Sequence, residues 1–239
     1  MKYFTEEWYH DSLVSQMCFS LRKSMRAAKL NEKYFESLYK SENKKYARSI
    51  KFICKYSKTP FDPEKTDKDF ESNYNDNLEF VKSFPCEITS RIADIRVFAL
   101  GVVEYDIFGE ITKYCGQMNR KCEKIKRDYY DHVDSFGEEI GWKKLDKLSL
   151  LNEAEISEFK LCGDDLVISS LSNCFAMTLY NEKNPLPEKY QNATIIASEF
   201  DKTEDGSRLT LSLLCETLDG ELFSDTLCFD NFEIIDTED

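Results

Sequence analysis

The sequence has little of what covalent catalysis or metal binding requires. Its 239 residues hold only two histidines, His10 and His132, so few combinations of a nucleophile, a histidine base and an acid are open to it. His132 follows a charged helical stretch beside Asp131 and Asp134, which is typical of a surface histidine at a helix end. No GxxxxGK[ST], GxGxxG, HExxH, GxSxG or EF-hand loop occurs, which excludes the enzyme classes that depend on those motifs.

The sequence also lacks the marks of secretion and of membrane insertion. Its nine cysteines are odd in number, scattered, and never spaced as CxxC, unlike the even, clustered cysteines of a secreted disulfide framework. Most of them fall at apolar positions, which predicts small buried thiols in a reducing cytosol. No signal-peptide core and no apolar run of bilayer length is present. We therefore expect a soluble cytoplasmic protein that needs no cofactor and no membrane.

Basic residues are scarce in one half of the chain only. Residues 1–145 hold 26 Lys and Arg against 24 Asp and Glu, a net charge of +2. Residues 146–239 hold 6 against 21, a net charge of −15. An acidic surface repels nucleic acid and anionic membranes, so the charge of the C-terminal half favours a basic protein partner.

Residues 1–145 have the periodicity of helices. Apolar residues recur at spacings of three and four in five stretches. The first extends to about Leu30, Asn31 is expected to cap the second, and Asp62-Pro63-Glu64 begins the third. The two remaining stretches are 86–100, which ends at Gly101, and 106–129. Asp94 and Arg96 lie two apart in one of these helices, so we expect them to have separate partners.

Two features of this helical half suggest chemistry only weakly. Lys44, Arg48, Lys51, Lys55 and Lys58 form a basic stripe opposite an apolar face that runs from Phe35 to Ile53. Such a stripe binds phosphates in some proteins, but a solvated helix face is the interpretation we favour, because no nucleic-acid module accompanies it. Cys115 and Cys122 share a helix face, but two thiols do not make a zinc site, which needs about four ligands.

From Ala154 onward the pattern is that of strands. The alternation of the first strand slips between Ile156 and Phe159, which predicts a bulge or a strand end. Residues 181–192 form a loop with two prolines, and Asp219-Gly220 between two alternating runs predicts a hairpin in which both turn residues have positive φ. Six or seven strands joined mostly by short turns predict an antiparallel sheet with one solvated, acidic face.

The sequence therefore predicts an α+β protein with two domains. Residues 1–145 form a helical module of about five helices, and residues 146–239 form an acidic antiparallel β module. The stretch Leu145–Leu171 joins the two modules. Near it lies the best carboxylate cluster, Glu153, Glu155, Asp164 and Asp165. These oxygens suit a divalent cation, but turns and strand faces also collect acids for solubility, so we predict no metal site.

Three strings resemble a known family. They are MKYFTEEWY at the start, ADIRVFALG at Ala93–Gly101 and KYC at Lys113–Cys115. Together they resemble the uncharacterised bacterial domain-of-unknown-function family numbered four-zero-eight-five. The resemblance implies a bacterial cytoplasmic protein and no assigned activity. The family pattern places Leu-His-Asp before the first strand, where this chain has Leu151-Asn152-Glu153. A base or metal role of that pair is not carried over, because an amide does not titrate, although Glu153 keeps a carboxylate.

Three hypotheses for function follow from the sequence. The first is a non-enzymatic interaction protein whose acidic β surface binds a basic partner. The second is a hydrolase or transferase with an unrecognised acidic site at the junction, near Glu153 and Glu155. The third, which the acidic balance disfavours, is nucleic-acid binding through Lys44, Arg48 and Lys51. The catalytic residues, the partner and the oligomeric state are not determined by the sequence.

Overall fold

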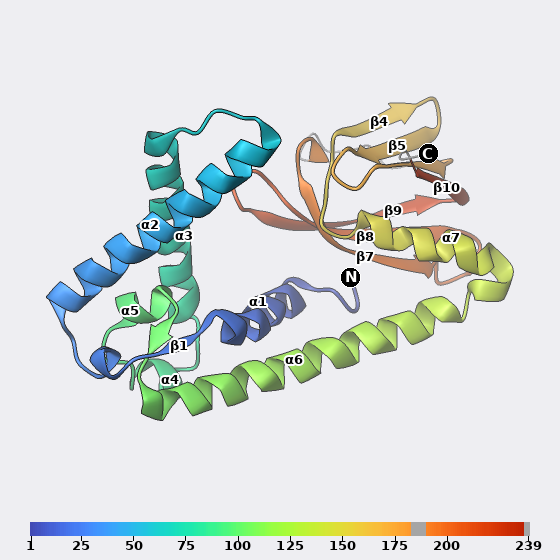
Figure 1. Ribbon diagram of the computed structural model, residues 1–239. Coiled ribbons are helices and arrows are strands. Elements are labelled where there is room, and N and C mark those ends of the chain that lie inside the picture. The colour runs from blue at the N-terminus through green and yellow to red at the C-terminus, as the bar shows by residue number, and fades with distance from the viewer. Residues whose placement is uncertain (183–189, 237–239) are drawn as a thin grey trace. The chain divides into compact units, whose positions relative to one another are not determined.

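The computed structural model describes residues 1–182 and 190–236, and its fold class is the predicted α+β. Within these residues seven α-helices, most of them in the first part of the chain, precede two antiparallel sheets (Figure 1). The chain divides into two compact units, a helical unit of Leu13–Asn119 and a strand unit that combines Met1–Ser12 with Arg120–Asp239. The boundary predicted at residue 145 marks the change from helix to strand, whereas the two units divide the chain elsewhere.

The helical unit contains two long helices, two short ones and about half of each of two further long ones. Two short parallel strands pair within it, Arg22 with Val102 and Lys23 with Val103. The elements are α1 (Glu6–Ser20), β1 (Arg22–Lys23), the 3-10 turn η1 (Met25–Ala28), α2 (Glu32–Ser57), α3 (Pro63–Lys82), α4 (Cys86–Thr89), α5 (Ile95–Ala99), β2 (Val102–Val103) and α6 (Tyr105–Asp134). Both α1 and α6 extend into the strand unit.

Two of the predicted helix starts are confirmed. The Asn31 side chain accepts a hydrogen bond from the backbone N–H of Tyr34 at 3.0 Å and caps α2. Asp62 caps α3 in the same way, and Pro63 occupies the first helical position, where its missing N–H costs nothing. Helices α2 and α3 then lie against each other, joined by edge-on aromatic contacts such as Tyr39 on Phe70 at 5.1 Å.

The first predicted helix is too long. It ends at Ser20 rather than near Leu30, because the next residues pair with β2 and Ser24 caps the 3-10 turn η1. The stretch 86–100 likewise forms two short helices and not one, because Asp94 has extended backbone and caps a new helix, α5. Local apolar spacing continues through both breaks, which depend on pairing and capping instead.

The prediction for Asp94 and Arg96 is wrong for the same reason. Because Asp94 is the cap and lies outside the helix, its carboxylate reaches the Arg96 guanidinium at 2.9 Å. Arg96 also pairs with Glu32 at 2.9 Å. The Asp94 side chain is 2% exposed, so this acid is buried beside its cation, and the pair of Arg96 with Glu32 links α5 to the start of α2.

The strand unit is built on two four-stranded antiparallel sheets, with the orders β10-β6-β5-β4 and β3-β7-β8-β9. Around them lie the second half of α6, the π-helical turn η2 (Gly137–Gly141), α7 (Trp142–Asp146) and the 3-10 turn η3 (Lys147–Leu151). The strands are β3 (Ala154–Glu155), β4 (Glu158–Cys162), β5 (Asp165–Ser170), β6 (Phe175–Tyr180), β7 (Thr194–Lys202), β8 (Leu209–Glu216), β9 (Leu222–Phe229) and β10 (Asn231–Asp236). Most of the loop predicted at 181–192 lies outside the described residues.

The passages from β3 to β4 and from β9 to β10 take the chain from one sheet to the other within a few residues, and each makes a corner of the unit. The slip in alternation after Ile156 is such a corner, since β3 pairs with β7 and β4 pairs with β5. Asp230 is the second corner, between β9 and β10. Sheets joined at such corners pack face to face, and one apolar cluster fills the space between them with residues such as Ile168, Met177 and Leu213.

The predicted hairpin at Asp219-Gly220 joins β8 to β9, but its turn is not the expected two-residue one. The last pair of the ladder is Glu216 with Leu222, so the loop has five residues. Only Gly220 has a positive φ, at 79°. The glycine is therefore required at one position, and Asp219 adopts an ordinary conformation.

Candidate functional site

A groove of about 1120 Å³ lies in the helical unit. Its walls come from α1, α2, α3 and the end of α5. Apolar side chains such as Leu13, Met17 and Phe80 line it, together with polar ones such as Asn73 and Asn77. A groove lined by both apolar and polar side chains suits a peptide segment that presents both kinds of group.

A charged cluster lies at one side of this groove. Glu42 accepts from Arg22 at 3.1 Å and from Lys45 at 2.8 Å, and Arg22 also donates to the Leu100 carbonyl at 3.1 Å. Burial acts to raise the pKa of Glu42, but the hydrogen bonds from Lys45 and Arg22 outweigh it and hold that pKa below its usual value. Glu42 is therefore a carboxylate that fixes two cations beside the groove.

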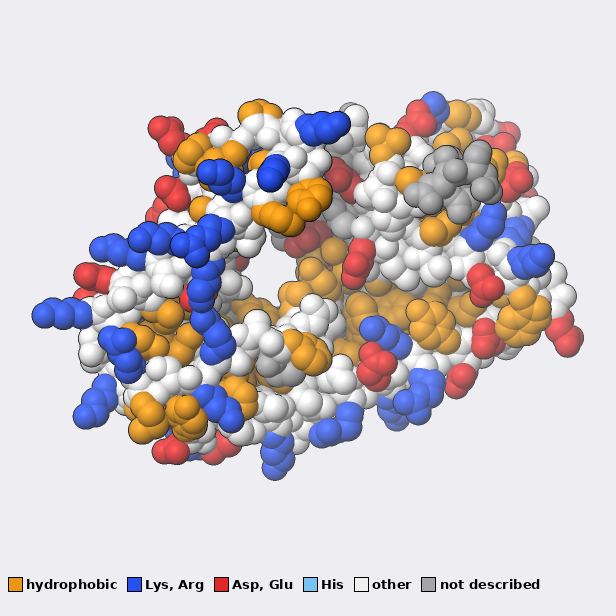
Figure 2. All heavy atoms as spheres, viewed as in Figure 1, with side chains coloured by type: hydrophobic (Ala, Val, Ile, Leu, Met, Phe, Trp, Pro, Cys, Tyr) orange, Lys and Arg blue, Asp and Glu red, His pale blue; other side chains and the backbone are white. Residues whose placement is uncertain are grey.

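The basic stripe of α2 carries aromatic rings as well as cations. Phe52 and Tyr56 are 61% and 74% exposed, with their ring centroids 4.7 Å apart. They alternate with Lys51 and Lys55, and Figure 2 shows basic and hydrophobic side chains together over this end of α2. Ile53, which the periodicity places on the apolar face, is 57% exposed, so that face ends earlier than predicted.

The strand unit has a buried carboxylate that the sequence analysis missed. Glu199 on β7 is 6% exposed and accepts hydrogen bonds from three successive backbone N–H groups, those of Lys2, Tyr3 and Phe4, at 2.7, 2.6 and 2.5 Å. Charge-assisted bonds of this kind are among the stronger ones in proteins. No local signal identifies Glu199, because its partners lie almost two hundred residues away.

His132, near the end of α6, faces the same strand through Asp201. Its Nε2 lies 3.1 Å from Asp201 Oδ1, in the geometry of an ion pair rather than of an aligned hydrogen bond. The His132 side chain is 28% exposed and its ring contacts Phe136 at 5.1 Å. The prediction of a surface histidine at the end of a helix is therefore only partly right, since much of its surroundings are protein.

Tyr129, one turn before His132, is fixed by the same strand. Its hydroxyl accepts a hydrogen bond from the Phe200 N–H at 2.9 Å. Burial raises the pKa of Tyr129 well above its usual value, so the phenol stays protonated and neutral. Glu199, Asp201 and Tyr129 line a small hollow of about 230 Å³, in which each of these three groups already has a protein partner.

The junction residues hold the strand unit together. Asn152 Oδ1 accepts from the Ser198 N–H at 3.2 Å and from its hydroxyl at 3.3 Å. Asn173 in turn donates to the Leu150 and Asn152 carbonyls at 2.9 and 3.0 Å. Glu153 follows with a φ of 58° and an exposed side chain. Asn152 is therefore an amide that ties η3 to β7.

The acidic set near the junction is not drawn together. The backbone of Glu155 donates to Ser172, and Asp165 accepts from the Asn181 N–H at 3.1 Å. Over the described parts of the chain, no three His, Cys, Asp or Glu side chains gather as metal ligands would. Neither Glu153 nor Glu155 lines the groove of the helical unit, the small hollow beside Tyr129 or the hollow beside Lys144 described below.

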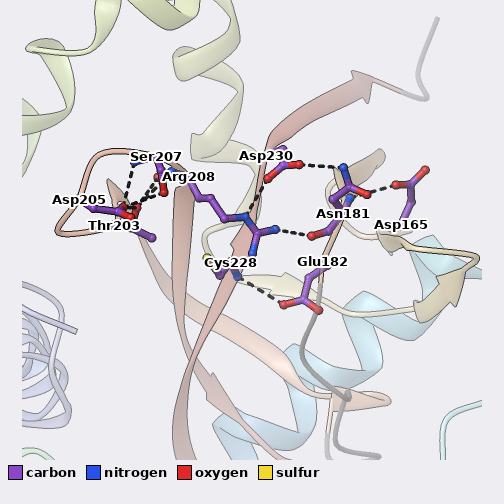
Figure 3. Close-up of polar contacts among 9 residues, drawn as sticks. All are labelled: Asp165, Asn181, Glu182, Thr203, Asp205, Ser207, Arg208, Cys228 and Asp230. Carbon is purple, nitrogen blue, oxygen red and sulfur yellow. Dashed lines mark hydrogen bonds and ion pairs between the residues drawn. The ribbon is translucent and has the colours of Figure 1, made fainter.

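An arginine fastens the corner at Asp230. Arg208 donates through Nε to Asp230 at 2.8 Å and through Nη2 to the Asn181 carbonyl, and the Asn181 amide donates to Asp230 at 2.7 Å. Figure 3 shows Arg208 between these two residues, with the Asp205 turn beside it. The contacts join the end of β6 and the start of β8 to the corner, so this cluster has a structural role.

A third hollow, of about 630 Å³, is lined in part by Lys144. Lys144 on α7 donates to Asn231 Oδ1 at 2.6 Å, and its ammonium lies 4.3 Å from the centre of the Phe232 ring. Burial lowers the pKa of Lys144 below that of an ordinary lysine, against the opposing charge of Glu233. Nothing in the sequence around Lys144 distinguishes it from its neighbour Lys143.

Eight cysteines have described side chains, and all are thiols. Cys115, Cys122 and Cys215 are buried as predicted, and burial raises the pKa of Cys122. Cys86 and Cys162 are exposed, so the prediction of buried thiols is wrong for these two.

Comparisons of the chain with protein-family models, with curated proteins and with solved structures found no match. The resemblance to the family numbered four-zero-eight-five therefore stays a prediction. No helix in residues 1–182 and 190–236 is long and apolar enough to cross a bilayer.

Proposed function

We propose that this protein is a non-enzymatic interaction protein whose strand unit binds a basic partner. The observation that carries the proposal is the division of charge between the units. The strand unit, Met1–Ser12 with Arg120–Asp239, holds 14 Lys and Arg against 30 Asp and Glu, a net charge of −16. The helical unit, Leu13–Asn119, holds 18 against 15, a net charge of +3. A field of one sign attracts and orients a partner of the opposite sign.

The turns of the strand unit supply the acids that we assign to this contact. Asp164, Glu204, Asp219 and Glu221 are exposed in or beside the turns between strands. Within the described residues none of the four forms an ion pair. Acids without a cation of their own are available to a partner, whereas Glu199 is used inside the unit.

The proposal is tested with an oligolysine peptide as the basic probe and fluorescence anisotropy as the readout. The variant Asp164→Asn, Asp219→Asn, Glu221→Gln removes three charges from the turns. The control Glu36→Gln, Asp69→Asn, Glu87→Gln removes three exposed charges from the helical unit. We expect the turn variant to bind about fivefold more weakly and the control to stay within about twofold of the native affinity. Equal weakening by both variants contradicts the proposal.

A second candidate function rests on the groove of the helical unit. Its volume of about 1120 Å³ and its apolar lining suit a partner segment that inserts apolar side chains. The probe is the dye anilinonaphthalene sulfonate, whose fluorescence rises in apolar sites. Leu13→Glu is expected to remove most of the signal, whereas Leu218→Glu, at an exposed leucine of the β8–β9 turn, leaves it unchanged. Equal signals from both variants contradict this role.

The remaining expectations belong with these proposals. We infer a cytoplasmic protein related to the bacterial family named above. The eight cysteines with described side chains are all thiols, which fits a reducing compartment. An acidic hydrolase or transferase site at Glu153 and Glu155, and nucleic-acid binding at Lys44, Arg48 and Lys51, stay predictions.

A further inference from the structure

Lys144 differs from several other lysines of the strand unit in the partners of its amine. Lys121, Lys126, Lys160 and Lys202 each pair with a carboxylate. Lys144 instead donates to a neutral amide oxygen, Asn231 Oδ1, and within the described residues no carboxylate lies at ion-pair distance from it. The amine is therefore held in place without a partner that requires its positive charge.

The surroundings of this amine are partly apolar and partly titratable. The Phe232 ring lies beneath it, and Lys144 itself is half-buried. The titratable groups that line the same hollow are Tyr180, Asp230 and Glu233. The Tyr180 hydroxyl donates to Glu233 Oε2 at 3.1 Å, and Asp230 pairs with Arg208 at 2.8 Å. All three titratable groups are thus already joined to other protein groups.

These effects act on the ammonium in opposite directions. Burial favours the neutral amine, whereas the charge of Glu233 and the face of Phe232 favour the ammonium. Burial is the larger effect, and the pKa of Lys144 is lowered. A desolvated lysine with a larger neutral fraction is the usual form of a nucleophilic amine.

We propose that Lys144 is a nucleophilic amine that forms an imine with a small, uncharged aldehyde bound in the hollow beside Phe232. The neutral Nζ attacks the carbonyl carbon and gives a carbinolamine. The carbinolamine then loses its hydroxyl, with one proton, as water. One C=N bond replaces the C=O bond, so no oxidant or reductant takes part, and the reaction is reversible.

The charges around the hollow select the class of aldehyde. Asp230 and Glu233 line it, so an aldehyde that carries a phosphate or a carboxylate is repelled. The volume of about 630 Å³ admits a short aliphatic or aromatic aldehyde.

The test labels the native protein with propanal in the presence of cyanoborohydride, which reduces an imine to a stable amine. Peptides from a glutamate-specific protease are then sequenced and quantified by tandem mass spectrometry. Lys143 is the matched control, because it precedes Lys144 in α7 and is exposed. At neutral pH we expect Lys144 to be labelled at least about threefold faster than Lys143. Equal rates overturn the proposal.

A second variant separates reactivity from simple access. Asn231→Asp puts a carboxylate where the amide accepts from Nζ, favours the ammonium and is expected to bring the labelling of Lys144 down to the rate of Lys143. The pH profile provides an independent readout on the native protein: labelling of Lys144 levels off at a lower pH than that of Lys143. Coincident profiles, or an Asn231→Asp protein that folds and labels as fast as the native one, contradict the proposal.

Discussion

The helical unit and the strand unit are held together over different distances along the chain. In the helical unit, neighbouring helices meet through residues such as Tyr39, Phe70 and Tyr74, and α2 and α3 each have their own cap. In the strand unit, Glu199 holds the backbone of Lys2–Phe4, from 195 to 197 residues away. The first kind of order follows local periodicity, whereas the second requires the chain to return to a remote segment.

Both units also bury an acid, but they neutralise it differently. Asp94 in the helical unit lies against the Arg96 guanidinium and accepts from the Arg96 N–H. Glu199 in the strand unit accepts from three backbone N–H groups instead of a cationic side chain. The first acid depends on one side chain, and the second depends on the path of the backbone. The difference indicates that a mutation of Glu199 releases a remote segment, whereas a mutation of Asp94 releases the cap of α5 and the side chain of its near neighbour Arg96.

The largest expected effect compares the two apolar cores. Phe98 and Phe175 are 0% and 1% exposed, and replacing either with alanine is expected to lower the free energy of unfolding by about 3–5 kcal/mol. Hydrogen exchange should show the loss of protection first in the unit that contains the change. The exposed Phe52→Ala serves as the control, with an expected change within about 0.5 kcal/mol. If protection from exchange is lost evenly over both units, the two cores do not stabilise their units separately, and the prediction is wrong.

The next effect concerns the hydrogen bonds from the backbone of Lys2–Phe4 to Glu199. Glu199→Ala leaves the N–H groups of Lys2, Tyr3 and Phe4 without their acceptor, and we expect a loss of about 1–3 kcal/mol. Amide exchange at Tyr3 and Phe4 should accelerate while exchange in α3 stays as in the native protein. Glu199→Gln keeps one acceptor oxygen, so its free energy of unfolding should lie between that of the native protein and that of the alanine variant. If Tyr3 and Phe4 exchange at native rates in the alanine variant, Glu199 does not hold this segment.

A smaller effect is expected at the corner of the strand unit. Arg208→Ala removes the bonds to Asp230 and to the Asn181 carbonyl. Because the Arg208 side chain is 19% exposed and Asp230 is 50% exposed, solvent screens this pair, and we expect a loss of about 1 kcal/mol in urea unfolding. Arg91→Ala, which breaks the exposed pair with Glu110 in the helical unit, is the matched control and should cost less. If Arg91→Ala lowers the free energy of unfolding as much as Arg208→Ala or more, the contacts of Arg208 at the corner stabilise no more than an ordinary surface pair.

The smallest effect is a dependence on pH in the turn before β8. Hydrogen bonds from the Thr203 hydroxyl and from the backbone and hydroxyl of Ser207 hold the pKa of Asp205 at about 2, below its ordinary 3.8. The folded state therefore favours the carboxylate, so its stabilising effect is present above about pH 4 and is lost as the pH falls towards 2. Asp205→Asn should remove this part of the acid dependence, measured by thermal unfolding between about pH 2 and 5. An unchanged acid dependence contradicts the assignment.

The sequence predicts best the features that depend on neighbouring residues. The α+β class, the cap of Asn31 and the proline start at Pro63 are confirmed. Each of these two helix starts depends only on residues within one turn of the cap. The slip after Ile156 predicts a bulge or strand end, and the structure shows the reason, a chain that changes sheets. The pairing of β1 with β2, which ends α1 early, has no signature in two residues of sequence.

The candidate sites are predicted less well, because their residues converge from distant segments. The basic stripe is visible in the sequence, but Phe52 and Tyr56 were missed as part of it, although their spacing of four residues places them on one face. Helix geometry, from which separate partners are expected for Asp94 and Arg96, does not hold for a residue that caps the helix. Glu199 and Lys144 owe their environments to segments far away in the chain, so no local pattern marks them.

The strand unit is assembled from both sides of the helical unit in the sequence, and this sets an order on synthesis. All of Leu13–Asn119 has left the ribosome while β7 is still to be made. The backbone of Lys2–Phe4 then waits for Glu199, up to 197 residues later. At the usual rate of about 5–20 residues per second, that delay is roughly 10–40 s. Lys2–Phe4 thus leave the ribosome before the helical unit, yet gain their acceptor only after β7 has been made.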